Sequence, residues 1–214
     1  MKNNKINFLR RFTPLNSCKA NLTGFTVVEV LITMGVFALV SSMVLANYPK
    51  FSERLTLEQT AQKIALSFRE AKILSLTVGE SEIGTRIFPG YGVHFDAGES
   101  GNNKRYLIFS DLNADKKYAE PDDGEKDIFG IQSSAFISGA CFGEEDAGSL
   151  SECQSYNQTK ILDIVFTRPK PSIDFYDGER SQWRGEQNVG IFIVNPEGDI
   201  KKIIIWKTGQ IMVE

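Results

Sequence analysis

The sequence predicts an α+β protein in which a long N-terminal helix precedes a domain of antiparallel strands. Residues 25–46 form a run of 22 residues with one charged side chain, Glu29, which is typical of a helix in an apolar environment. Between residues 57 and 78, apolar side chains recur every three or four positions, the period of one helix face. Beyond Gly79 apolar and polar residues alternate, the period of half-buried strands. A helix laid on an antiparallel sheet satisfies all three observations.

Composition and charge exclude several classes of protein. The chain has 214 residues, of which 42% are hydrophobic and 24% are charged, and this composition excludes disorder as the main state. Its three cysteines lack the C-x-x-C spacing of a zinc site. The net charge of −3 provides no bulk attraction to nucleic acid, and the sequence contains no clear nucleic-acid site.

The charge is distributed unevenly along the chain. Residues 1–24 hold five basic side chains and no acidic one, so residues 25–214 carry a net charge of −8. As a helix, residues 25–46 would be about 33 Å long, enough to cross a hydrocarbon core of about 30 Å. Basic residues before such a span place the N-terminus in the cytoplasm. We therefore expect a single-pass protein of the cytoplasmic membrane, with the rest of the chain extracytoplasmic.

Two hypotheses explain the apolar segment. In the first, it is an ordinary secretory signal that is cleaved after Ala46, where small residues suit signal peptidase, and the protein is secreted. In the second, the segment is retained as an anchor. Glu29 favours the second hypothesis, because a carboxylate within an apolar run costs a few kcal/mol and by default marks a functional residue with a partner.

The residues around Glu29 resemble a known processing site. The stretch reads Gly24-Phe25-Thr26-Val27-Val28-Glu29, and it joins a short basic leader to the apolar run. It resembles the processing site of type IV prepilins and pseudopilins. The resemblance implies the pilin fold, in which the membrane helix continues as a spine packed on a β-sheet domain. It also implies a structural subunit, a minor pilin or pseudopilin, assembled into a type IV pilus-like or type II secretion pseudopilus filament.

The resemblance assigns roles to individual residues and partners. Gly24 is the last leader residue, and prepilin peptidase cleaves after it and methylates the new amino terminus on Phe25. The expected partners are this peptidase, other pilin or pseudopilin subunits, the filament assembly platform in the membrane and the lipid bilayer. The expected domains are a leader at 1–24, a transmembrane helix at 25–47, an amphipathic spine at 48–79 and an extracytoplasmic β-rich domain at 80–214.

Glu29 is the predicted assembly residue. Cleavage creates an ammonium group on Phe25 at the membrane boundary. Subunits stacked side by side with a small axial offset bring the Glu29 carboxylate of one subunit near the Phe25 ammonium of another. In a low-dielectric helix core such a pair is worth several kcal/mol, whereas either charge alone is penalised. The pair would therefore set the register of one subunit against the next.

The helix is expected to continue beyond the membrane as the spine. Pro49 lacks an N–H donor and can kink or interrupt it. Beyond Pro49 an apolar stripe is predicted to pack on the sheet, and Gly79 is the expected stop. The stripe consists of Leu57, Ala61, Ile64, Phe68, Ala71, Ser75 and Val78.

Alternation and turn residues predict the strands. We expect strands at 91–96, 105–109, 127–138, 160–167, 171–176, 189–194, 200–206 and 208–213. Turns are expected at 97–103, 195–198 and 206–210. The strand sequences YGVHF and YLIFSDLNAD and the closing TGQI are similar to those of the H-type minor pseudopilins of type II secretion.

An acidic loop is a candidate calcium site. Asp111, Asn113 and Asp115 form the D-x-N-x-D opening of a calcium loop, and Asp122 lies at the twelfth position. Against calcium, the sixth position is Lys116, where an EF-hand has glycine. The loop is therefore either a solvated acidic turn or a calcium site. Calcium is the only cofactor that the sequence suggests, and the resemblance favours it because pseudopilins as a family use calcium in a surface loop.

Two cysteines flank a second loop. Cys141 and Cys153 enclose a segment rich in glycine, serine and glutamate. Cys18 would leave with the leader, so the mature protein would hold an even number of cysteines. Outside the cytoplasm a bridge would add about 2–3 kcal/mol of stability. Two free thiols are the alternative.

Catalytic chemistry finds little support in the sequence. The sole histidine, His94, lies in an alternating strand without an accompanying serine or cysteine motif, which favours a structural role. Phosphate loops of the Walker or Rossmann type are absent. We therefore expect that the protein is not an enzyme. A binding module at a filament tip, contacting secreted substrate, DNA or a surface through the two loops, is the alternative to a purely structural subunit.

Overall fold

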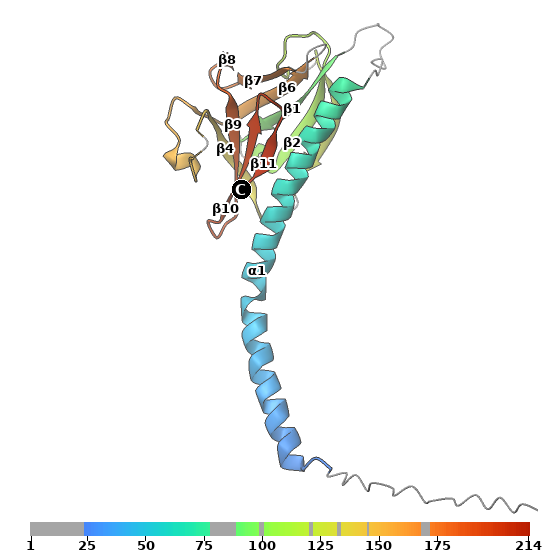
Figure 1. Cartoon of the computed structure of the whole chain (residues 1–214), viewed down its shortest axis with the longest axis vertical. Coiled ribbons are helices and arrows are strands. Elements are labelled where there is room, and N and C mark those ends of the chain that lie inside the picture. The colour runs from blue at the N-terminus through green and yellow to red at the C-terminus, as the bar shows by residue number, and fades with distance from the viewer. Residues whose placement is uncertain are drawn as a thin grey trace, which may run out of the picture. The chain divides into compact units, whose positions relative to one another are not determined.

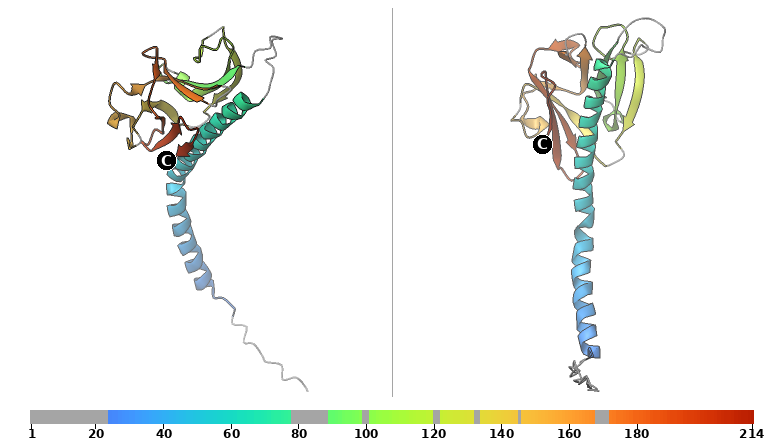
Figure 2. Two further views of the ribbon diagram at one scale, coloured as in Figure 1. Left: turned by 45° about the horizontal axis from the view of Figure 1, so that its top comes forward. Right: turned by 45° about the vertical axis from the view of Figure 1, so that its right-hand side comes forward.

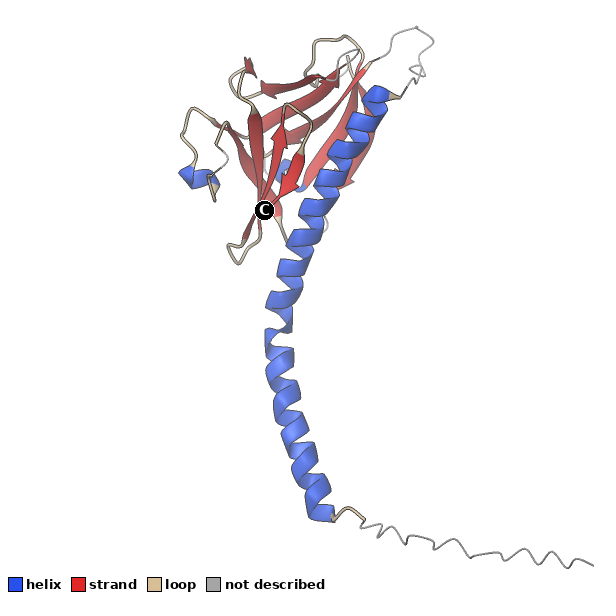
Figure 3. Ribbon diagram, viewed as in Figure 1, coloured by secondary structure: helices blue, strands red, loops and turns tan. Residues whose placement is uncertain are grey.

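The computed structural model describes residues 24–77, 89–98, 101–119, 122–131, 134–144, 146–167 and 172–214. The chain divides into two compact units, Met1–Ala46 and Asn47–Glu214. The basic leader, Cys18, Val78 and Gly79 lie outside the described residues. The architecture is α+β, with one long helix followed by antiparallel β-sheets (Figure 3).

The helix α1 comprises Val27–Leu76 and continues through Pro49. In the N-terminal unit its side chains are exposed, and the segment is long and apolar enough to be a single membrane span or a signal anchor. In the C-terminal unit one face is buried, and it contains the predicted stripe from Leu57 to Ser75. Ala65 and Ser67 are also buried, because a broad sheet surface covers more of the helix than a single stripe.

The strands form two antiparallel sheets. Sheet A has the order β3-β2-β1-β6-β7-β8, and sheet B has the order β11-β10-β9-β4-β5. The bounds are β1 Gly90–Asp96, β2 Arg105–Asp111, β3 Gly124–Gly130, β4 Phe136–Phe142, β5 Gln158–Thr159, β6 Ile161–Thr167, β7 Ser172–Asp177, β8 Gln182–Arg184, β9 Asn188–Val194, β10 Ile200–Trp206 and β11 Ile211–Val213. Two short 3₁₀ helices, η1 Asn102–Lys104 and η2 Leu150–Glu152, lie in the connections.

One hydrophobic core lies between residues 57–74 of α1 and the inner faces of both sheets (Figures 1 and 2). Alternation along each strand divides its side chains between this core and the outer face of its sheet. In β1, Val93 and Phe95 enter the core, whereas His94 between them lies on the outer face of sheet A. In β9, Val189 and Ile191 enter the core and Phe192 lies on the outer face of sheet B.

One predicted strand is wrong. Residues 127–138 do not form a single strand, because β3 ends at Gly130 in sheet A and β4 begins at Phe136 in sheet B. Ile131 and Ala135 are buried between them, and these apolar residues extend the alternating pattern across a connection. The buried apolar residues of this connection therefore gave the sequence the alternating pattern of a strand. The short strands β5 and β8 were not predicted.

Candidate functional site

The residues of the Gly24–Glu29 motif lie at the start of α1. Gly24 and Phe25 precede the helix, and no side chain or backbone atom lies within 4 Å of a Cβ built on Gly24. Phe25 is 81% exposed. The Gly24–Phe25 peptide bond is therefore unobstructed by other described parts of the chain.

Thr26 caps the helix. Its Oγ1 accepts a hydrogen bond from the backbone N–H of Glu29 at 3.2 Å, and its carbonyl accepts one from Val30 at 3.2 Å. A threonine followed three residues later by glutamate is the signature of a capping box. Glu29 also lies in the first helical turn, where the helix dipole favours a negative charge. The T-x-x-E spacing was visible in the sequence, and the sequence reasoning missed it.

Apolar side chains cover α1 on all sides in the N-terminal unit. The exposed large ones include Phe25, Val27, Val28, Val30, Leu31, Ile32, Met34, Val36, Phe37, Leu39, Val40, Met43, Val44 and Leu45. Thr33 and Ser42 donate their hydroxyls to carbonyls three residues earlier, so these polar groups are satisfied within the helix. A helix that is apolar all round needs a lipid or protein environment.

The acidic loop, residues 111–123, is organised by carboxylate oxygens that accept backbone N–H groups. Asp111 is 2% exposed and accepts from Asp115 and from Lys116, both at 3.1 Å. The side-chain oxygen of Asn113 also accepts from Asp115, at 2.9 Å. Lys116 has φ 63°, the left-handed conformation for which an EF-hand uses glycine at this position. The first half of the loop therefore has the turn of a calcium loop with lysine at its sixth position.

Two adjacent aspartates in the second half of the loop lie in different environments. Asp122, chosen by its spacing, is exposed, whereas Asp123 is 7% exposed. Asp123 accepts hydrogen bonds from the backbone of Leu112 at 3.2 Å and of Ala119 at 2.9 Å. The structure therefore brings Asp123 against the start of the loop. Counting positions could not distinguish two adjacent aspartates.

The carboxylates of the acidic loop lie in one another's electrostatic field. Burial and, to a smaller extent, the charges of Asp123 and Asp115 raise the pKa of Asp111 to about 6, against the backbone hydrogen bonds from Lys116 and Asp115 that lower it. Burial likewise raises the pKa of Asp123, with contributions from Asp115 and Asp122. Partly buried like charges raise each other's energy. A bound cation would relieve this repulsion.

The acidic loop also covers the outer face of sheet A. The ring of Tyr118 contacts Phe109 of β2 at a centroid distance of 5.3 Å, and Phe109 is fully buried as a result. Lys116 reaches β7, where its Nζ lies 2.9 Å from Asp174 Oδ2. The loop is therefore part of the folded domain, with one carboxylate-rich end and one aromatic end.

The disulfide loop, residues 141–153, covers the outer face of sheet B. Cys141 and Cys153 form a disulfide with their Cα atoms 6.1 Å apart. Together with Ala147 and Phe192 they form a second, smaller hydrophobic cluster. Buried Lys202 donates from Nζ to the carbonyl of Ala147 at 3.0 Å, which fixes the loop to β10.

A β-bulge explains why Cys141 points outward. The pairing of β4 with β9 shifts between Ile137 and Gly139, so Ala140 and not Gly139 enters the core. Gly139 has φ 148°, and a Cβ there would lie 3.0 Å from both Leu150 Cδ2 and the Thr159 carbonyl. The bulge reverses the alternation and leaves Cys141 facing Cys153 on the outer surface of the sheet.

Two arginines fix the disulfide loop and its continuation to β8 and the turn before it. Arg180 donates to the carbonyls of Gln158 at 2.5 Å and Ser155 at 2.8 Å. Arg184 donates to Asn157 Oδ1 at 2.7 Å and lies 4.7 Å from the centre of the Phe142 ring. The sequence did not single out either arginine, because their partners are remote in the chain.

Clusters of side chains that could bind a metal ion are scarce in the described part of the chain. There, the only three His, Cys, Asp or Glu side chains with ligand atoms all within 4.8 Å of one another are Cys141, Glu144 and Cys153. The two sulfur atoms of this trio are bonded to each other and are not metal ligands. The carboxylates of the acidic loop are more widely spaced than this.

His94 is hydrogen-bonded on the outer face of sheet A. Its Nδ1 lies 2.5 Å from Asp163 Oδ1, and Asp163 is 2% exposed. The other oxygen of Asp163 accepts the backbone N–H of Tyr118 at 3.2 Å. The interaction joins neighbouring strands β1 and β6, which pair at these two residues.

Compared with known proteins, the chain matches no family model, no curated protein and no solved structure. The grounds for assigning a function are therefore the residues and geometry described above.

Proposed function

We propose that this protein is a minor pilin or pseudopilin, processed by prepilin peptidase and assembled into a type IV pilus-like or type II secretion pseudopilus filament. In this proposal residues 1–24 are removed, Phe25 becomes the methylated N-terminus, and the domain beyond the membrane helix has the pilin fold. The subunit is held in the cytoplasmic membrane with its N-terminus inside until it enters the filament.

One observation carries the proposal: the Gly24–Glu29 motif lies at the start of a helix that is apolar and exposed to residue 46 and buried on one face beyond residue 57. A secretory signal does not need to continue as the spine of the domain that it exports. A filament subunit needs this continuity, because the exposed half must leave the bilayer and pack against other helices without losing its connection to the folded domain.

Glu29 supplies the specificity of that packing. It is the only charged residue of the apolar segment. When such helices leave the lipid and pack together, only one axial alignment pairs this charge with an opposite one. Its own backbone N–H is already bonded to Thr26. No described side chain makes an ion pair with its carboxylate, which leaves the carboxylate for the Phe25 ammonium of a neighbouring subunit. Removing one member of such a buried pair costs about 3–5 kcal/mol.

N-terminal sequencing of the protein from membranes tests the proposal. We expect the mature chain to begin at methylated Phe25. A chain that begins at Asn47 would establish the secretory-signal hypothesis instead. Deleting the prepilin peptidase of the host should leave residues 1–24 attached, and a chain that is shortened in that strain would contradict the proposal.

We also propose that the acidic loop binds calcium. Asp111, Asn113 and Asp115 would provide oxygens from the first half of the loop, and the left-handed Lys116 gives the loop the turn that such ligands require. Asp123 would be the closing ligand in place of Asp122, because its carboxylate is the one held against the loop. Burial, together with the charges of neighbouring carboxylates, raises the pKa of both Asp111 and Asp123, and a cation at this position would offset both effects.

Calorimetry with calcium, using the full chain in detergent, tests this second proposal. Asp111→Asn should abolish the binding heat. Asp123→Asn should weaken binding far more than Asp122→Asn, and the reverse order would restore the spacing-based assignment. Lys116→Gly should tighten binding, because it removes a positive charge and the strain of a left-handed lysine. No binding heat at millimolar calcium would leave the loop as an acidic turn.

A further inference from the structure

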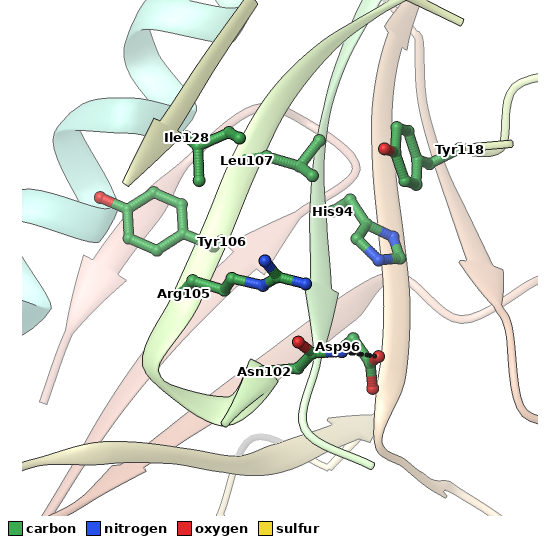
Figure 4. Close-up of a pocket in the computed structure, with 8 residues that line it drawn as sticks. All are labelled: His94, Asp96, Asn102, Arg105, Tyr106, Leu107, Tyr118 and Ile128. Atoms are coloured by element: carbon green, nitrogen blue, oxygen red, sulfur yellow. Dashed lines mark hydrogen bonds between the residues drawn. The ribbon is translucent and has the colours of Figure 1, made fainter. Parts of the chain in front are cut away.

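An open cavity lies on the outer face of sheet A, beside the acidic loop. Its volume is about 390 Å³, within the range of small-molecule sites. Its lining includes His94 and Asp96 from β1, Arg105 and Leu107 from β2, Ile128 from β3 and Tyr118 from the acidic loop (Figure 4). The cavity therefore joins three adjacent strands and a loop that is held to the domain by its own contacts.

The imidazole of His94 is fixed in the wall of the cavity. Asp163 holds its Nδ1, and the ring of Tyr118 packs on it at a centroid distance of 4.6 Å. Nδ1 is thus in use, and Nε2 makes no hydrogen bond with a residue that the structure describes. Nε2 is the ring nitrogen available to a ligand. Because Nδ1 faces the Asp163 carboxylate, Nε2 donates to a ligand when the ring carries both protons.

Arg105 is a cation without a partner among the described residues. Figure 4 shows its guanidinium extending from β2 toward β1, where His94 and Asp96 lie. The acidic residue of the lining, Asp96, already accepts hydrogen bonds from Gly98 N–H and from Asn102 Nδ2, both at 2.8 Å. The positive charge of Arg105 therefore remains available, in a geometry suited to a carboxylate.

The remaining wall of the cavity is apolar. Ile128 is 58% exposed, and Leu107 of the next strand is paired with it in the sheet. An exposed isoleucine beside an unpaired guanidinium offers a ligand both an apolar contact and an ion pair. A ligand that uses both must carry its negative charge on an apolar or aromatic body.

We propose that this cavity binds a carboxylate carried on an apolar or aromatic body. Arg105 pairs with the carboxylate, Nε2 of His94 donates a second hydrogen bond to it, and Leu107 and Ile128 contact the body. The carboxylate belongs either to a free organic acid or to the C-terminal residue of a polypeptide. The inference rests on the folded domain alone and is independent of the proposed role in a filament.

The single histidine of the chain provides a direct measurement. Full-length protein carrying labelled histidine, purified in detergent through a histidine-free tag, gives one set of imidazole signals in an NMR spectrum. N-acetylphenylalanine should shift these signals saturably, with a half-point on the order of 1 mM. N-acetylphenylalanine amide, which lacks the charge, should not shift them. An equal shift with the amide, or a shift that never saturates, would overturn the proposal.

Two surface variants assign the contacts. Arg105→Gln should weaken the acid about tenfold, whereas Lys104→Gln, which removes the same charge from the preceding exposed residue, should leave affinity within about twofold. Ile128→Ala should weaken N-acetylphenylalanine but not acetate. Unchanged His94 signals without ligand would show that each variant is folded. If folded Arg105→Gln binds as well as the unaltered protein, the assignment of Arg105 is wrong.

A peptide arm distinguishes the two sources of the carboxylate. A hexapeptide that ends in phenylalanine should bind at least about tenfold more tightly than N-acetylphenylalanine if chain ends are the ligand. Weaker binding of the peptide identifies a free organic acid. Absence of a saturable response to either compound would show that the cavity does not bind carboxylates.

Discussion

Thr26 Oγ1 accepts the backbone N–H of Glu29 at 3.2 Å, so the residue pair that begins α1 also contains the only charge of its apolar segment. Two roles for Glu29 follow. As the third residue of a capped helix, it stabilises the helix start locally. In the proposed filament its carboxylate, which makes no ion pair with a described side chain, would select the position of a neighbouring subunit. Variants at the two positions separate these roles.

Glu29→Gln should be inserted and cleaved but should fail to co-assemble. Glutamine keeps the shape and hydrogen-bonding capacity of glutamate and removes the charge that pairs with a neighbouring Phe25. Thr26→Ala is the matched control, because it removes the cap at a cost of about 1 kcal/mol and leaves the charge. Crosslinking to other filament subunits in membranes, beside a processing assay, measures both effects. If Glu29→Leu assembles as well as the unaltered protein, the charge-pair mechanism is incorrect.

Gly24→Val should block leader removal. The site around Gly24 is open in the structure, so the substitution disturbs no contact within the described chain and acts on the peptidase. Gly35→Ala is the control, since a Cβ at Gly35 also meets nothing within 4 Å. Mass spectrometry of membrane protein should find the leader on the first variant only. Normal processing of Gly24→Val would refute the assignment of the cleavage site.

Replacing Cys141 and Cys153 together by serine should destabilise the domain by about 3 kcal/mol, because the open loop regains conformational entropy in the unfolded chain. Thermal unfolding in detergent measures the loss. In the unaltered protein, neither Cys141 nor Cys153 should react with a thiol-labelling reagent under denaturing, non-reducing conditions. Complete labelling of both cysteines in mature protein would favour the free-thiol alternative.

Stability in calcium-free buffer should fall as pH rises from about 4 to about 6. Asp111 has a pKa of about 6 in the folded protein and an ordinary value of 3.8, so in this window the folded state holds a proton that the unfolded chain releases. The protonated form is therefore the stabilising one, and its contribution is lost above pH 6. The difference between these two pKa values corresponds to about 3 kcal/mol in the free energy of unfolding.

Asp111→Asn should flatten this pH dependence and raise the melting temperature at pH 7 without calcium. Asp123 acts in the same direction, so part of the slope remains. Asp127→Asn, at an exposed position of β3, serves as the control and should leave the slope unchanged. An equally steep profile in Asp111→Asn would show that this carboxyl does not govern the dependence.

Features that depend on neighbours in the chain could be predicted from the sequence. The membrane-compatible segment follows from composition, and the buried stripe on α1 from Leu57 to Ser75 follows from helical periodicity. The turn at Asn195 is local as well, with Gly198 donating to its carbonyl at 3.0 Å. The Gly24–Glu29 stretch and the D-x-N-x-D spacing can be read from the sequence for the same reason, because their residues lie within a few positions of each other, and their proposed roles remain predictions.

Features that depend on contacts between distant residues were not predictable. His94 and Asp163 are 69 residues apart, and only the pairing of β1 with β6 brings them together. The choice of Asp123 over Asp122 depends on which carboxylate reaches the backbone of Leu112 across the loop.

The sequence by itself therefore determined the order of most elements, the apolar N-terminal segment and the positions of two loops. Only the tertiary structure decided which sheet each strand joins and which outer face each loop covers. The physical reason is that a strand's alternation identifies a buried side but not the partner that buries it. Tyr118 over Phe109 and Cys153 beside Phe192 are contacts of that kind, because each packs a loop residue on the outer face of a sheet.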